Sequence, residues 1–137
     1  MKLNEASVLK AHGINPSAQR VAVAQFVLHT DEHPSADAVW TRVQKRFPHV
    51  SRATVYNTLN LFVRKGLLRS FVLTEGRVVF DSKTENHHHF IDEETGMIHD
   101  IPWDAIEVSN IRKLQGLDIR EYQVVMRGRV AKKNGGP

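Results

Sequence analysis

The spacing of hydrophobic residues in this 137-residue chain changes at Gly66, and this change restricts the folds that the chain can adopt. Before Gly66, apolar residues recur at helical spacing in four segments, at about residues 3–11, 17–28, 36–47 and 52–65. After Gly66, residues 67–73 and 77–80 alternate between apolar and polar around Thr74-Glu75-Gly76, which is typical of a β-hairpin. Short helices followed by a two-stranded hairpin are the element order of a winged helix-turn-helix domain.

A polar stretch at residues 82–86 separates this half from a second one. There we predict short strands at 87–91 and 97–101, a helix at 103–114 and a long final strand at 117–130. This half is too small to close a core by itself, and pairing with a second copy would cover its exposed sheet edge. The sequence therefore predicts an α+β protein with a winged-helix domain at 1–81, a hinge at 82–86 and a small α/β dimerisation domain at 87–137.

The composition limits the chemistry that is available. The chain has no cysteine, which excludes disulfides, thiolate zinc sites, iron–sulfur ligation and cysteine nucleophiles, so His and carboxylate groups must hold any metal. Nineteen Lys and Arg against fifteen Asp and Glu give a formal charge of +4, which is compatible with a polyanion partner without demonstrating one. No apolar run approaches the roughly 18 residues that a membrane span needs, so we expect a cytoplasmic protein.

The segment 52–65 has two distinct sides. Val55, Leu59 and Phe62 form an apolar stripe, while the opposite side is polar and begins at Arg52. A helix-turn-helix protein inserts the start of its second helix into the major groove, where Arg pairs with guanine and small apolar groups contact the thymine methyl. A solvated outer face of an ordinary helix shows the same pattern. The candidate DNA-contacting residues on this segment are Arg52, Ala53, Thr54, Tyr56, Asn57 and Asn60.

Histidines and carboxylates gather in the second half. Because side chains alternate across a strand, His87 and His89 are predicted on one face of their strand and His88 on the other. In the next strand Asp100 is the better ligand candidate, and His99 points to the opposite face. Nitrogen and oxygen donors without sulfur suit Fe(II), Mn(II) or Zn(II), although solvated histidines at a strand start are a second explanation.

Three segments, NPSAQRVAVAQFVL, HPSADAVW and SRATVYNTLNLFVRKGLL, resemble the DNA-binding domain of the ferric uptake regulator family. With the histidine strand, the resemblance covers nearly the whole chain. It implies a metal-dependent transcriptional repressor that binds a double-stranded DNA operator as a homodimer. Residues 51–65 would be its recognition helix, and Arg20, at the position of the family's Pro-x-x-Gln-Arg motif, would belong to the adjoining region.

Five residues match, one by one, the regulatory metal ligands of peroxide-responsive repressors in this family: His33, Asp81, His87, His89 and Asp100. Iron-sensing members commonly carry Glu at the position of Asp100, so the aspartate favours peroxide sensing. In those relatives Fe(II) reacts with hydrogen peroxide and the imidazoles matching His33 and His87 are oxidised. Mn(II) supports DNA binding without that damage, and Zn(II) is a substitute in vitro.

The chain departs from the family at two positions that most members use for a structural zinc. One Cys-x-x-Cys pair is replaced by Asp92-Glu93-Glu94-Thr95, and the other is missing from the tail at 129–137. The structural zinc that those four cysteines hold should therefore be absent, so the dimerisation domain must hold together by packing of its apolar side chains. A further site in some members uses histidines where this chain has Glu121 and Tyr122, so we expect one regulatory site per protomer.

Three other functions remain open on the sequence. The run HHHFIDEETGMIHDIP also resembles the iron response regulators of the same superfamily, which sense haem through such histidines. Two His and one carboxylate are also the ligand set of a non-haem iron enzyme. We expect no enzyme, because a short chain half spent on a winged helix leaves little volume to enclose a substrate. A winged-helix module without metal is the last alternative.

Overall fold

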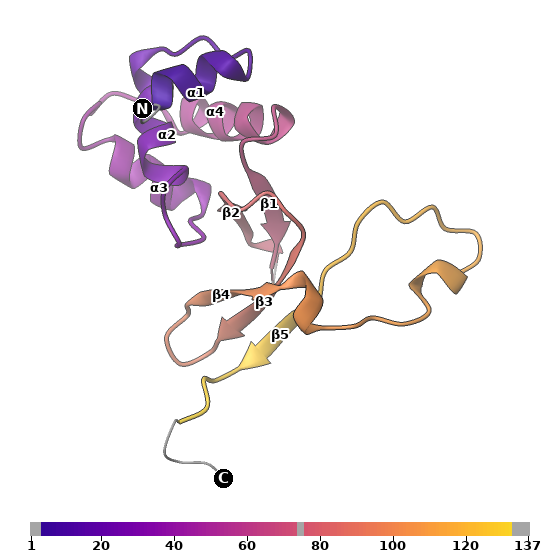
Figure 1. The fold of residues 1–137 in the computed structure, drawn as a ribbon. Coiled ribbons are helices and arrows are strands. Elements are labelled where there is room, and N and C mark those ends of the chain that lie inside the picture. The colour runs from indigo at the N-terminus through magenta and orange to yellow at the C-terminus, as the bar shows by residue number, and fades with distance from the viewer. Residues whose placement is uncertain (1–3, 74–75, 133–137) are drawn as a thin grey trace. The chain divides into compact units, whose positions relative to one another are not determined.

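The computed structural model describes residues 4–73 and 76–132 of the chain (Figure 1). These form two compact units, Met1–Thr84 and Glu85–Pro137, and each is considered separately. No helix among the described residues is long and apolar enough to cross a membrane.

The first unit contains four helices: α1 (Glu5–Ala11), α2 (Ala18–Val27), α3 (Ala36–Val43) and α4 (Arg52–Arg64). Each begins after a polar residue whose side chain accepts a hydrogen bond from a backbone N–H of the first turn. These caps are Asn4, Ser17, Ser35 and Ser51. A capping side chain satisfies one of the amides that a helix start leaves without a partner, which explains why the helices begin at these residues.

The helices pack their apolar faces into one core. Val55, Leu59 and Phe62 of α4 have no exposed surface, which confirms the predicted apolar stripe. Leu9 and Val39 are equally buried against them in the same cluster. Burying each such side chain contributes about 1.5–3 kcal/mol, so this stripe fixes α4 to the rest of the unit and leaves its other side exposed.

A two-stranded hairpin follows α4. β1 (Arg69–Val72) pairs antiparallel with β2 (Val78–Asp81), with Arg69 opposite Asp81. Gly66 and Gly76 have φ values of +81° and +72°, so glycine supplies the left-handed conformation at the end of α4 and at the last residue of the predicted turn. The other two residues of that turn, 74 and 75, lie outside the described residues.

The second unit is a three-stranded sheet in the order β4-β3-β5. β3 (His87–Asp92) pairs antiparallel with β4 (Ile98–Pro102), and His89 lies opposite Asp100. β5 (Val125–Gly128) runs parallel to β3, and Val125 lies opposite His89. The two predicted strands at 87–91 and 97–101 are therefore present to within one residue at each end.

The predicted helix at 103–114 is wrong. The segment forms two 3₁₀ turns, η2 (Trp103–Ala105) and η3 (Ile111–Lys113), joined by irregular chain. Asn110 between them has φ +68°, a left-handed conformation that an α-helix cannot accommodate. Figure 1 shows the chain between η2 and β5 extending away from the sheet as a long loop.

The predicted strand at 117–130 is also mostly wrong, because only Val125–Gly128 pairs with the sheet. The parallel register explains its late start. Since Val125 faces His89 and β3 begins at His87, residues before 123 have no part of β3 to pair with. Leu114, Leu117 and Ile119 consequently stay 53%, 63% and 38% exposed.

Apolar side chains do not form a buried core in the described part of the second unit. Its fully buried residues are instead His87, His88, His89 and Asp92. The apolar groups expected to pack this domain are all only half-buried: Ile91, Ile101, Trp103, Ile106, Ile111 and Val124. The described residues of this small unit therefore bury too little apolar surface to form a core of their own.

Candidate metal centre

In the first unit, one histidine and one aspartate of the predicted set lie together. His33 Nε2 is 3.1 Å from Asp81 Oδ2, and both side chains are almost fully buried. The loop before α3 reaches the end of β2 because the Phe80 N–H donates a hydrogen bond to the Pro34 carbonyl oxygen, 2.9 Å away. The Lys83 N–H donates to Asp81 Oδ1 at 2.9 Å, which leaves Oδ2 directed at the imidazole.

In the second unit, the other three residues of the set lie together. His87 Nε2 and His89 Nε2 are 3.3 Å and 3.4 Å from the same oxygen, Asp100 Oδ1. The strands cause this convergence, because His87 and His89 alternate onto one face of β3 and Asp100 is the antiparallel partner of His89. The two imidazole rings lie edge to face with centroids 4.7 Å apart.

The remaining ring nitrogens are occupied by oxygen acceptors. His87 Nδ1 lies 2.6 Å from the Glu85 carbonyl oxygen, and His89 Nδ1 lies 2.7 Å from Gln123 Oε1. Because these oxygens accept, each Nδ1 carries a hydrogen, and each Nε2 is the nitrogen that faces Asp100. A histidine ring that donates from Nδ1 in this way binds a metal through Nε2.

This donor set fits a divalent cation. Two imidazole nitrogens and a carboxylate oxygen facing one another are stabilised by a positive charge among them, which a divalent cation can supply. Ligands that share one ion at bond lengths of about 2.0–2.2 Å lie roughly 3–3.5 Å apart, and the separations at Asp100 Oδ1, 3.3 and 3.4 Å, fall in that range. The His and Asp chemistry suits Fe(II), Mn(II) or Zn(II) and does not select among them.

The other histidines of the sheet lie elsewhere. His88 is on the opposite face of β3 from His87 and His89, where it stacks on Trp103 with centroids 4.6 Å apart and accepts a hydrogen bond from the Val124 N–H. His99 is the strand partner of Phe90 and not of His89. It lies on the opposite face from Asp100, and strand alternation predicted this. The Tyr122 ring contacts Trp103, with centroids 4.8 Å apart.

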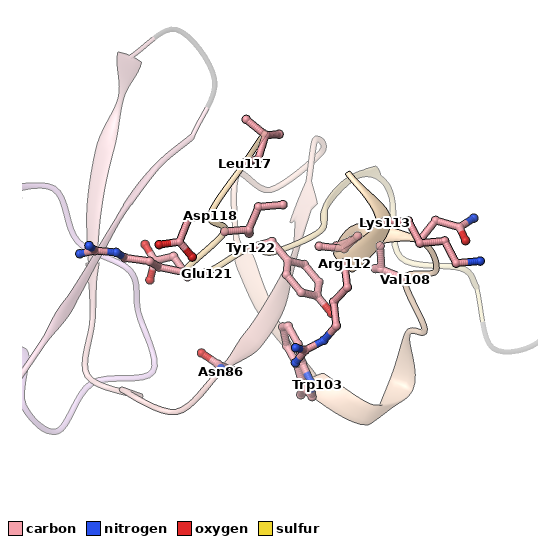
Figure 2. A pocket seen from close by; sticks show the side chains of 13 residues that line it. Asn86, Trp103, Val108, Arg112, Lys113, Leu117, Asp118, Glu121 and Tyr122 are labelled. Atoms are coloured by element: carbon pink, nitrogen blue, oxygen red, sulfur yellow. The ribbon is translucent and has the colours of Figure 1, made fainter. Parts of the chain in front are cut away.

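A hollow of about 710 Å³ lies on the second unit, apart from the metal residues (Figure 2). Figure 2 shows the rings of Trp103 and Tyr122 within it, and Arg112 and Lys113 come from η3. None of the five predicted ligands is among the residues that line it. Its walls are largely the irregular segment 108–122, so it is a product of the loop that replaces the expected helix.

The candidate DNA-contacting residues lie mainly on the outer side of α4. Arg52, Ala53, Tyr56, Asn57 and Asn60 are exposed there.

Two of the candidates are used locally. Thr54 is half-buried and its hydroxyl lies 2.9 Å from the Ser51 hydroxyl of the helix cap. Arg20 is half-buried on α2, where it donates to the Asn15 carbonyl oxygen.

Three groups that position predicted site residues were not predicted from the sequence: Trp40 and Asp37 beside Arg52, and Gln123 beside His89. The Arg52 guanidinium lies 4.5 Å over the Trp40 ring, and its Nε is 3.8 Å from Asp37 Oδ1. The third is Gln123, the acceptor for His89. Trp40 is half-buried against the core and reads as a core residue in the α3 pattern, and the contact of Gln123 with a residue 34 positions away has no local signal.

Comparisons with known proteins agree with these features. The peroxide operon regulator of Bacillus subtilis (strain 168) is 33% identical over 107 residues, covering 77% of this chain and 74% of that protein. The peroxide-responsive repressor PerR of Staphylococcus epidermidis is 32% identical over 102 residues, covering 74% of this chain and 67% of its own length.

Solved structures share the fold. The Campylobacter jejuni peroxide stress regulator superposes with a TM-score of 0.65 at 26% identity, over 97% of this chain and 99% of its own. A zinc-bound manganese uptake regulator gives a TM-score of 0.68 at 22% identity, over 94% and 100%. These matches confirm the predicted α+β class.

The family itself follows from the sequence profile. Residues 11–127 match the profile described as the Ferric uptake regulator family. The His and Asp donors described above are typical of that family, whose members regulate transcription. The chain therefore belongs to the ferric uptake regulator family of metal-dependent transcriptional regulators, and it is not an enzyme.

Proposed function

We propose that this chain is a peroxide-sensing repressor that binds operator DNA as a homodimer in the cytoplasm and carries one regulatory Fe(II) or Mn(II) per protomer. The single observation that carries the proposal is the convergence of His87 Nε2 and His89 Nε2 on Asp100 Oδ1. The third ligand is an aspartate, which the resemblance associates with peroxide sensing. The similarity to the peroxide operon regulator of Bacillus subtilis supports the same signal.

One ion would be shared by five side chains. His87, His89 and Asp100 would supply three donors, and His33 with Asp81 would supply two more. Each group supports this role by its own geometry, since both bring imidazole Nε2 atoms to within 3.1–3.4 Å of a carboxylate oxygen. All five offer nitrogen or oxygen, which is the ligand chemistry of Fe(II) and Mn(II).

DNA binding and dimerisation are proposed for separate parts of the chain. The exposed side of α4 carries Arg52 at its first turn, where recognition helices contact base edges. The second unit leaves Leu114 and Leu117 more than half exposed and buries no apolar side chain among its described residues. A second copy would cover such surface, and two recognition helices would then address a two-fold symmetric site.

Peroxide sensing would act through the ligands. A chain with no cysteine cannot use thiol oxidation, and a metal-bound imidazole would be in contact with the oxidant where it forms. Bound Fe(II) would supply the reaction with hydrogen peroxide, in which one peroxide oxygen is added to a ring carbon of His33 or His87 and the other leaves as water. An oxidised ring no longer offers the same Nε2 lone pair, so the ligand set is lost and the DNA is released.

The test compares the Fe(II) and Mn(II) forms of the whole protein after brief exposure to hydrogen peroxide. We expect one added oxygen on His33 or His87 and release of operator DNA in the Fe(II) form, with the Mn(II) form unmodified and bound. Tryptic peptides 21–42 and 84–112 carry the two sites. Peptide 84–112 also contains Met97, which is 59% exposed, so fragment ions must place the oxygen on the ring and not on the thioether.

Asp100→Glu is the matched control, since it keeps a carboxylate and introduces the residue typical of iron sensing. We expect it to retain metal-dependent DNA binding and to lose most of the histidine oxidation. Oxygen found equally in the Fe(II) and Mn(II) forms would contradict peroxide sensing. DNA release upon chelation without any histidine oxidation would indicate an iron-responsive regulator, and a spectral shift of added haem that depends on these histidines would indicate a haem-responsive one.

A further inference from the structure

His89 has a side-chain partner outside its own strand pair. Its Nδ1 lies 2.7 Å from Gln123 Oε1, and the His89 side chain is only 1% exposed. Water therefore has almost no access to His89 Nδ1 and cannot readily replace the Gln123 amide as its hydrogen-bond partner. The partner of His87 is different in kind, because the Glu85 acceptor is a backbone carbonyl that no substitution removes.

The backbone holds Gln123 in place. The next residue, Val124, accepts a hydrogen bond from the His89 N–H at 3.0 Å and donates from its own N–H to His88 Nδ1 at 2.9 Å. Both bonds fasten the chain at the entry to β5 against the middle of β3. The position of Gln123 along β3 is therefore fixed, and its side chain lies beside the His89 ring.

The direction of this hydrogen bond decides which nitrogen His89 offers. An amide oxygen accepts, so Nδ1 carries a hydrogen and Nε2 is the nitrogen that faces Asp100 Oδ1 and can bind metal. Without that acceptor, the Nε2–H tautomer becomes favourable, because its hydrogen would point at the Asp100 carboxylate. That tautomer satisfies the aspartate with a proton and blocks the nitrogen that would bind metal.

We infer that Gln123 is a positioning residue for the regulatory metal, which holds His89 in the tautomer that presents Nε2. The inference rests on the proposed metal site for its consequence but not for its geometry. A neutral amide is a weaker acceptor than a carboxylate, which makes His89 a weaker ligand than a histidine–carboxylate pair would provide. Gln123 therefore also moderates the metal affinity of the site.

The first measurement uses metal-free, full-length protein labelled with ¹⁵N-histidine, in which two-bond N–H correlations distinguish the two tautomers of each ring. We expect a hydrogen on Nδ1 of His87 and of His89 in the wild-type protein. In Gln123→Leu, His89 should shift to the Nε2–H form while His87 stays unchanged, because its acceptor is the backbone. Gln123→Glu should keep the Nδ1–H form of His89, since it retains an oxygen acceptor.

The second measurement is Mn(II) affinity by competition with a chelator of known affinity. Loss of a hydrogen bond to a ligating histidine costs roughly 10–100-fold in metal affinity, and we expect a decrease of that size in Gln123→Leu. Gln123→Glu should bind as tightly as the wild type or more tightly. Gln115→Leu is the matched control, because it makes the same chemical change at an exposed position of the same unit and should leave tautomer and affinity unchanged.

The possible failures are distinguishable. An Nε2–H tautomer of His89 in the wild-type protein overturns the inference, whether or not Gln123→Leu folds. A Gln123→Leu protein with wild-type tautomer and Mn(II) affinity overturns it as well. If the wild-type protein binds no metal, the proposed function fails, while the tautomers still decide whether Gln123 sets the state of His89.

Discussion

At the scale of single residues, neighbouring groups decide which atom a functional side chain presents. The Lys83 N–H donates to Asp81 Oδ1, so Oδ2 is the oxygen that faces His33. The Glu85 carbonyl oxygen accepts from His87 Nδ1, so Nε2 is the nitrogen that faces Asp100. Arg52 follows the same principle. Its guanidinium is stacked over Trp40 beside the Asp37 carboxylate, so an exposed arginine is held in one region before DNA arrives.

This placement predicts the effect of Arg52→Ala. If Arg52 pairs with a base, the substitution weakens binding to the operator by about 1–3 kcal/mol and relaxes the preference for one base pair. A phosphate contact would instead weaken binding to all sequences alike and reduce its salt dependence. Binding isotherms on operator and scrambled DNA at several salt concentrations separate the two.

Arg42→Ala is the control for that prediction, because Arg42 also lies over an aromatic ring, 4.8 Å from the centroid of Phe26, but belongs to α3 and not to α4. It should leave operator preference unchanged. Equal effects of the two substitutions would remove Arg52 from the reading residues.

At the scale of elements, local signals made the first unit predictable. The serine caps, the apolar stripe of α4 and the glycine turns all act within a few residues of the elements they define. The segment 103–124 has no comparable determinant. Its state depends on the register of β5 against β3 and on what covers Leu114 and Leu117, and neither is encoded nearby.

The residues of the candidate site also divide into those that a local signal could predict and those that it could not. Strand alternation was enough to place His87 and His89 on one face and to prefer Asp100 over His99, and the register of the two strands then brings Asp100 to the same side of the sheet. The resemblance to a family was needed to add His33 and Asp81, because they come from a loop and a strand end that are far apart in the sequence. Neither route could identify Gln123, which acts through a single long-range hydrogen bond.

The turn between β3 and β4 gives a prediction at this scale, because the family resemblance implies a zinc-binding Cys-x-x-Cys pair at this place. The Glu94 N–H donates to Asp92 Oδ1 at 2.9 Å, and this bond lowers the pKa of the Asp92 carboxyl below its ordinary value of 3.8, with a further contribution from Thr95. A depressed pKa in the folded state means that the ionised carboxylate stabilises the fold at pH values above the unfolded pKa. That stabilisation is lost as the pH falls through the folded pKa.

We therefore expect Asp92→Asn to be less stable than the wild type at pH 7, with the difference disappearing as the solution becomes more acidic than the ordinary carboxyl pKa. Thermal unfolding followed by circular dichroism over that pH range measures it. Asp104→Asn is a control on an exposed aspartate of the same unit. A difference that stays constant with pH would mean that shape, and not charge, stabilises the turn.

At the scale of the whole molecule, the two units contribute different parts of the proposed regulator. The first unit carries α4 together with His33 and Asp81, and the second carries His87, His89 and Asp100 with the surface proposed for dimerisation. If one ion is shared by donors from both units, metal binding restricts how the units move about residues 82–86. Metal and DNA binding then become linked, because each favours the same arrangement.

Linkage is reciprocal, and this gives the last prediction. Whatever factor Mn(II) adds to operator affinity, saturating operator DNA must add to Mn(II) affinity, and couplings of this kind are typically about 5–150-fold. Fluorescence anisotropy of labelled operator with and without Mn(II), and chelator competition with and without operator, give the two factors independently. In Asp81→Asn the second unit keeps its three donors, so we expect Mn(II) still to bind, more weakly, while the coupling to DNA largely disappears. Asp31→Asn, an exposed aspartate in the loop before α3, should keep both affinity and coupling. Identical Mn(II) affinity with and without operator in the wild-type protein would show that metal does not act by joining the two units, even if the ligands of the second unit are assigned correctly.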